Sequence, residues 1–310
     1  MNAITLLLGY AVALSWFAPA LLTRPSSTQI PPRLAVTGWM AAVGTAMLAW
    51  MAALAIMIYG AAHSVLTDTA LTFCVETLGI TPAVLLPPAA ATALVLALLL
   101  LTTTVAIHTA RRVVVSLLAN RRRNLAHAEA VQLVGHRTGQ DGVVTITADR
   151  PTAYCVSGGG RRAIVVTTAA LELLNSTGLA AVLAHERAHL RGRHHRIIAI
   201  LNALSAALPR LPLLRAAAQS VPTLLEMCAD DAAAREHGHE PLLASMLALS
   251  TGHRVPEGAL AAAGTAVGDR AKRLMEPDSG SWRQPHSLLM AAAVTATVAV
   301  PGLALMLCGL

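Results

Sequence analysis

Two histidines and a glutamate stand close together in the stretch LAHERAHLRGRHH, which begins at residue 183. His185 and His189 are four residues apart, so on a helix both imidazoles lie on one face and can bind the same metal ion. Glu186 follows the first histidine and can reach a water molecule next to that ion. The spacing therefore predicts a site for one zinc ion, with His185 and His189 as ligands and Glu186 as the catalytic base of a hydrolysis.

A third ligand must come from another segment, because a catalytic zinc usually has three protein ligands and one open position. We expect it to be Glu226, in LLEMCADDAA, on a second helix after a connection long enough to reverse the chain. Asp230 lies one turn later on the same face, where it can accept a hydrogen bond from a ligating imidazole. The competing candidates for the third ligand are Asp231, Glu236 and His237.

Two more histidines and the cysteines receive no role in this site. His194 and His195 follow Gly192, which is expected to end the helix, so we expect both at the surface. The four cysteines form no CxxC pair, and we expect small buried side chains without disulfides at Cys74, Cys155, Cys228 and Cys308.

The elements around these residues follow from capping and alternation patterns. The helix with the histidines is expected from the cap-type residues 175–177 to Gly192, and the second helix from about Ser220 to Gly238. Four strand-like segments precede them: AVQLVGH, GVVTITAD, TAYCVSG and RAIVVTT. The last segment, residues 162–168, is either an exposed edge that binds an extended peptide by strand addition or an ordinary strand within the sheet.

The rest of the chain is typical of a membrane protein. Hydrophobic residues make up 55% of the 310 residues and charged residues only 13%, about half the usual share for a soluble domain. Four apolar runs, residues 4–22, 34–62, 84–107 and 287–310, are each long enough to cross a bilayer. The first has no basic residue before it, so we expect a retained helix and not a cleaved signal peptide.

Arginine placement predicts the orientation in the membrane. Arginines lie in the connection after the first run and, at positions 111, 112 and 121–123, after the third, whereas the second connection has neither lysine nor arginine. Basic loops stay in the cytoplasm, so the N-terminus is expected outside and residues 111–286 inside. We therefore expect a multi-pass protein of four transmembrane helices, three of them within residues 1–110. A cytoplasmic α+β domain is inserted between helices three and four.

The net charge of +7 does not indicate a nucleic-acid partner. Aromatic residues are only 3% of the chain, so a surface for stacking bases is not expected. The expected partners are the lipid bilayer and a protein substrate.

Several quoted segments together resemble a known group. The stretch from AYCVSGGGRRAIVVTT through the histidine motif, then EMCADDAA and DRAKRL, resembles the BlaR/MecR-type membrane metallopeptidases and, more distantly, the HtpX-type membrane proteases. Both are gluzincins, in which zinc is bound by the HExxH histidines and a downstream glutamate. The resemblance implies that His185, His189 and Glu226 bind zinc, that Glu186 is catalytic, and that Asp230 supports a ligand.

The resemblance also implies a function. We expect an endopeptidase that cleaves a cytoplasmic or membrane-associated protein, such as a winged-helix repressor. Tyr154 and Arg270 are candidates for contacts to the substrate or the oxyanion. The alternatives are a quality-control protease for membrane proteins and a non-catalytic signalling protein with a structural metal. The β-lactam receptors of this group carry an extracellular sensor after the last membrane helix. The sequence stops at Leu310, so we do not expect it to sense antibiotics directly.

Overall fold

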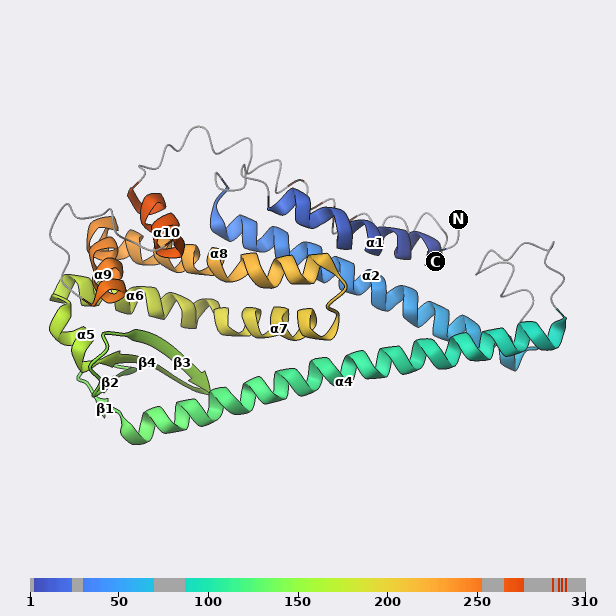
Figure 1. Ribbon diagram of the computed structural model, residues 1–310, viewed down its shortest axis with the longest axis horizontal. Coiled ribbons are helices and arrows are strands. Elements are labelled where there is room, and N and C mark those ends of the chain that lie inside the picture. Colours follow the sequence, from blue (N-terminus) through green and yellow to red (C-terminus); the bar gives the residue numbers. More distant parts are fainter. Residues whose placement is uncertain are drawn as a thin grey trace. The chain divides into compact units, whose positions relative to one another are not determined.

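The computed structural model describes residues 3–23, 30–69, 87–252 and 265–275, together with residues 292, 295, 297 and 299. The chain divides into two compact units: residues 1–115, 201–220 and 284–310 form the first, and residues 116–200 and 221–283 form the second. The boundaries fall inside the helices α4, α7 and α8, shown in Figure 1, so the units share continuous helices.

The first unit contains long apolar helices. α1 (Ala3–Leu22), α2 (Pro32–Leu66) and α4 (Pro88–Val134) are long and apolar enough to cross a membrane. Small side chains let α1 and α2 pack closely, at Leu7 and Ala11 against Ala49 and Ala53. Large apolar side chains elsewhere on these helices are exposed, for example Leu100 at 70%. An exposed apolar surface of this kind fits a lipid environment.

The expected fourth membrane helix, residues 287–310, lies outside the described residues except at four helical positions. One of these, Thr297, accepts a hydrogen bond at its carbonyl oxygen from the hydroxyl of Tyr10 on α1.

The second unit is built around a small mixed sheet. Its strands are β1 (His136–Arg137), β2 (Val143–Ile146), β3 (Ala153–Gly158) and β4 (Arg161–Thr167), in the spatial order β1-β2-β4-β3. β4 pairs in parallel with β2 and antiparallel with β3. The segment RAIVVTT is therefore an ordinary strand within the sheet and not an exposed edge. The edge strand beside it is β3.

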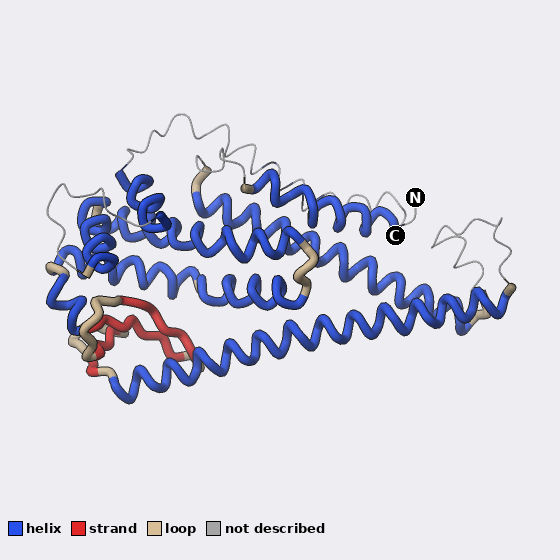
Figure 2. The backbone as a smooth tube through the Cα atoms, in the orientation of Figure 1, coloured by secondary structure: helices blue, strands red, loops and turns tan. Residues whose placement is uncertain are grey.

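Alternation along the strands gives the sheet two buried faces. Val156 and Val165 face the end of α4 at Ala128 and Val131. Ile164 and Val166 lie on the other face and pack with Leu183 of α6 (Ser176–Gly192). Figure 2 shows the strands between these helices.

The end of α4 corrects one expectation. AVQLVGH was expected to be a strand, but α4 continues to Val134 and leaves only two residues for β1. Ala128 and Val131 are three residues apart and are buried together, so the apolar residues here have helical and not strand spacing. Gly158 on β3 allows the close approach, because an added Cβ would lie 2.6 Å from the carbonyl oxygen of Asn124 on α4.

Further helices follow α6 along the chain. They are α7 (His194–Ala207), α8 (Pro212–His237), α9 (His239–Thr251) and α10 (Thr265–Met275), and the short α5 (Thr168–Leu173) precedes α6. Residues of α6, α8, α9 and α10 share one apolar cluster, including Ala184, Ala233, Leu243 and Leu274. α8 begins eight residues before the expected Ser220, with Pro222 inside it.

Candidate metal centre

The HExxH motif lies on α6, as expected. The helix begins where the side chain of Asn175 accepts a hydrogen bond of 2.8 Å from the backbone N–H of Gly178, a typical N-cap. Its buried side contacts the sheet through Leu183, which fixes the direction in which the histidines point. The Nε2 atoms of His185 and His189 are 3.0 Å apart, and His185 is buried.

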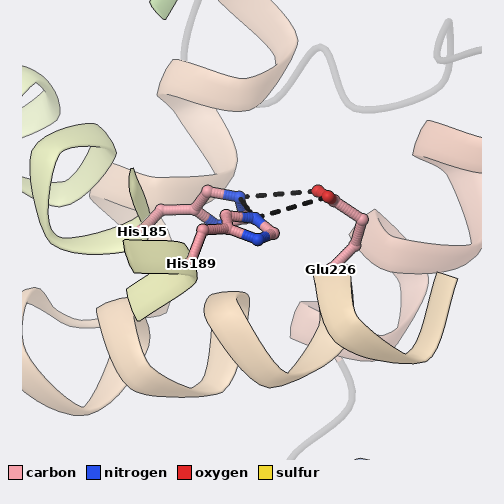
Figure 3. Close-up of side chains that lie close together, drawn as sticks. All are labelled: His185, His189 and Glu226. Carbon is pink, nitrogen blue, oxygen red and sulfur yellow. Dashed lines mark hydrogen bonds and ion pairs between the residues drawn. The ribbon is translucent and has the colours of Figure 1, made fainter. Parts of the chain in front are cut away.

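Glu226 of α8 completes a group of three donors (Figure 3). Its Oε2 lies 3.5 Å from Nε2 of His185, and its Oε1 lies 3.3 Å from Nε2 of His189. Ligands at about 2.05 Å in a tetrahedral zinc site are separated by about 3.3 Å. The spacing and chemistry of these donors therefore fit a zinc ion.

The competing third ligands lie elsewhere. Asp231 forms an ion pair of 2.6 Å with Arg273. Glu236 and His237 lie 3.6 Å from each other near the end of α8. None of the three belongs to the group formed by His185, His189 and Glu226 among the described residues.

Asp230 supports the site from behind, at the position expected for it. Its Oδ1 lies 3.0 Å from Nδ1 of His185, close enough for an ion pair although the N–H does not point squarely at the oxygen. Arg270 of α10 donates two hydrogen bonds of 2.7 Å to the same carboxylate. Arg270 also reaches Oε2 of Glu226 at 3.2 Å, so one guanidinium holds a ligand and its neighbour together.

Charges in the site favour a cation. Burial alone would lower the pKa of His185, but contacts to Asp230 and Glu226 outweigh burial and raise it to about 9. Burial opposes ionisation of Glu226 and Asp230 as well, yet their contacts with the histidines and with Arg270 lower both pKa values. The three carboxylates at positions 186, 226 and 230 face one guanidinium, and a divalent ion would neutralise the excess while displacing imidazole protons.

Glu186 has the surroundings of a general base. Burial is the largest influence on its pKa and raises it, so this pKa is closer to neutral pH than that of a solvated glutamate. His185, Glu186 and Glu226 line a cavity of about 510 Å³. Arg270 lines the same cavity, so the structure brings this candidate contact residue into the site.

Tyr154 is not brought into the site. It faces α4, where its ring stacks with His127 at a centroid distance of 5.7 Å. The neighbouring residue Cys155 points to the other face of β3 and contacts the carboxylate of Glu186. Burial and that negative charge raise the pKa of its thiol to about 12. Sequence reasoning missed Cys155, although strand alternation places positions 154 and 155 on opposite faces.

The expectation that His194 lies at the surface is wrong. Its side chain is buried, and its Nδ1 lies 2.8 Å from Nδ1 of His189. Burial and the neighbouring His189 lower the pKa of His194 to about 4. The helix does end at Gly192, but the chain then turns back through Arg193, which has φ 51° and ψ 37°. This left-handed turn brings His194 back to the site. Helical spacing does not predict the contact, because the helix ends before His194.

Among the described residues, Cys155 and Cys228 are in no disulfide; Cys228 is buried and Cys155 is partly buried. Cys74 and Cys308 lie outside the described residues.

Comparison with known proteins agrees with this chemistry. Residues 119–234 match the model of peptidase family M48. The matched segment includes the sheet, the HExxH motif, Glu226 and Asp230, and it ends before Arg270. Neither the curated proteins nor the solved structures give a match. The family match and the donor group together support a metallopeptidase domain of the M48 type, and peptidases of that family typically depend on zinc.

Proposed function

We propose that this protein is a zinc endopeptidase of the membrane, which cleaves a cytoplasmic or membrane-associated protein in regulatory proteolysis. The observation that carries the proposal is the convergence of His185, His189 and Glu226, with donor atoms 3.0 to 3.5 Å apart. Two of these donors, His185 and Glu226, line one cavity together with Glu186. These three residues would hold the ion. Bound zinc supplies a Lewis acid that lowers the pKa of water and polarises a carbonyl group.

Glu186 moves the protons in this proposal. Its carboxylate accepts a proton from the attacking water, and the carboxylic acid then passes it to the nitrogen of the leaving amine. The raised pKa of Glu186 suits both steps. Arg270 holds Glu226 and Asp230 in place. It also faces the cavity, where its guanidinium is a candidate donor to the oxyanion.

The edge strand β3 is the proposed binding place for the peptide. β4 pairs on both sides, but β3 pairs with β4 alone among the described strands. Ala153, the first residue of β3, lines the cavity with Glu186. A peptide added as a further strand would therefore run past the catalytic base. The sequence suggested RAIVVTT as an edge that binds a peptide; in this proposal its neighbour β3 has that role.

The cavity favours an apolar side chain next to the cleaved bond. Val182 of α6 and Leu242, Met246 and Leu249 of α9 form its apolar wall. A large apolar residue of the substrate would bury its surface there, with about 1.5–3 kcal/mol for full burial. We propose substrates with Leu, Met or Phe at this position.

The BlaR/MecR type, and a winged-helix repressor as substrate, are the favoured form of the proposal. They are supported by the order of apolar helices before the motif and by the segments quoted above. Quality-control proteolysis is the alternative within the same chemistry. A non-catalytic signalling role is less well supported, because Glu186 lines the same cavity as the donors His185 and Glu226.

The test replaces Glu186 by glutamine in the full-length protein. We expect Glu186→Gln to keep bound zinc and to lose about 10²–10⁴-fold in cleavage of a library of peptides with central Leu, Met or Phe. The matched control is Glu129→Gln, an exposed glutamate on α4, which should cleave like the unmodified protein. Undiminished cleavage by Glu186→Gln would sink the mechanism. Proteome comparison of cells with either form separates one cleaved repressor from broad degradation.

A further inference from the structure

His194 occupies a place behind His189 that corresponds to the place of Asp230 behind His185. The rings of His189 and His194 meet edge to face, with centroids 4.8 Å apart and planes at 87°. Their Nδ1 atoms are 2.8 Å apart, a hydrogen-bond distance. Only 8% of His194 is exposed. Each histidine of the HExxH motif therefore has a polar partner at the ring nitrogen that faces away from Glu226.

Gly192 leaves the room that the His194 ring needs. A Cβ at this position would lie 2.3 Å from Nε2 and 2.5 Å from Cδ2 of His194. Gly192 is the last residue of α6 and is not among the described glycines with positive φ. Its backbone thus suits any residue, and the space for the ring is what requires glycine. The unusual backbone falls on Arg193, which turns the chain so that α7 starts with the His194 ring against α6.

We propose that His194 is a positioning residue for the metal ligand His189. A neutral imidazole has one N–H and one acceptor nitrogen. When Nδ1 of His189 carries the hydrogen and donates it to Nδ1 of His194, Nε2 of His189 keeps its lone pair for the ion. The contact also fixes the plane of the His189 ring. Partners of this kind behind ligating histidines typically contribute 10–100-fold to metal affinity.

This inference rests on the proposed zinc site, and zinc affinity tests it without measuring cleavage. In His194→Asn, the amide oxygen stands close to the place of Nδ1 and can accept the hydrogen. His194→Leu has a similar branched shape but no acceptor. The neighbouring His195→Leu is the control, since no contact of His195 to a zinc ligand occurs among the described residues. Apparent zinc affinity is measured by competition with a fluorescent chelator on the full-length protein in detergent.

We expect His194→Leu to bind zinc about 10–100-fold more weakly, and His194→Asn to recover most of that loss. The visible spectrum of Co²⁺ bound in place of zinc should change in His194→Leu and not in His195→Leu. Zinc affinity of His194→Leu equal to that of the unmodified protein overturns the inference while leaving the zinc site intact. Absence of zinc binding by the unmodified protein overturns the proposed function, and this inference with it.

Gly192→Ala gives a second test that keeps every polar group. The added methyl group should displace the His194 ring and weaken zinc binding, although alanine is the better helix former. Combined with His194→Leu it should cause little further loss, because both changes act on the same contact. If His194→Leu does not fold, Gly192→Ala decides the matter: unchanged zinc affinity in that variant contradicts the positioning role.

Discussion

Asp230 links the proposed metal ligand His185 to Arg270. It is 1% exposed, contacts Nδ1 of His185 and accepts both hydrogen bonds from Arg270. The spacing Glu226-x-x-x-Asp230 made its role predictable, since one helical turn separates the two residues. The partner Arg270 lies 40 positions away along the chain, and no local pattern predicts that distance.

Asp230→Asn should weaken the site in two ways. It removes the negative charge opposite Arg270 and His185, which leaves a partly buried guanidinium without its full partner. We expect unfolding free energy to fall by on the order of 3 kcal/mol and zinc affinity by about 10–100-fold. Chemical denaturation and chelator competition measure the two effects. Glu236→Gln, which changes an exposed carboxylate on the same helix outside the donor group, should leave zinc affinity nearly unchanged.

Cys155 should tune the pKa of Glu186, the proposed catalytic base. The thiol is protonated at neutral pH, because its pKa is raised to about 12. Its hydrogen bond to Glu186 lowers the pKa of that carboxyl group. Cys155→Ala removes that effect, so the pKa of Glu186 should rise. Because the carboxylate is the active form, the acid limb of the kcat/KM profile should move to higher pH. Cys155→Ser keeps a donor and should move it less, whereas an unmoved limb in Cys155→Ala would contradict the contact.

At the scale of elements, α10 carries Arg270 to the site and is held on α8 by two arginines. Arg270 pairs with Asp230, and Arg273 pairs with Asp231 at 2.6 Å. Ala271 and Leu274 of α10 pack into the apolar cluster shared with α6 and α9. Docking of α10 is therefore part of assembling the site.

Reversing the outer pair should loosen α10. Arg273→Glu faces Asp231 with a like charge, so Arg270 should lose its position and kcat/KM for peptide cleavage should fall several-fold. The exchange Asp231→Arg with Arg273→Glu restores opposite charges and should recover much of the loss. Arg235→Glu, an exposed reversal on α8, serves as the control. An exchange variant no better than Arg273→Glu alone would speak against the pair.

Elements with a local signal were predictable, whereas their neighbours in space were not. The cap at Asn175 and the periodic apolar residues indicated α6 to within a residue. The order of the strands depends on pairing between segments far apart in sequence, so RAIVVTT fitted an edge or a central position equally well. The return of His194 depends on one left-handed residue, Arg193, where sequence patterns favour no such turn.

At the scale of the whole molecule, the apolar helices and the peptidase chemistry occur in one chain. Three described helices are apolar and long enough to cross a bilayer, which length and composition predicted. α4 continues without interruption past Arg111 and Arg112 into the unit with the candidate metal centre. Orientation rests on the arginines, and we propose that the peptidase unit is cytoplasmic with the N-terminus outside.

Thiol labelling tests that orientation. In protein whose four native cysteines are replaced by serine, Asp68→Cys after α2 should react with a membrane-impermeant maleimide added to intact cells. Asp141→Cys, exposed in the turn before β2, should react only after the cells are permeabilised. Labelling of Asp141→Cys in intact cells would reverse the assignment.

The zinc content of the purified full-length protein tests the central claim most directly. Without added metal, the unmodified protein is expected to carry one zinc ion per chain, and Glu226→Gln is expected to lose most of it. Glu236→Gln, on the same helix and outside the donor group, should retain the zinc. An unmodified protein without stoichiometric zinc, or a Glu226→Gln variant with its full complement, would contradict the assignment of His185, His189 and Glu226 as the metal site.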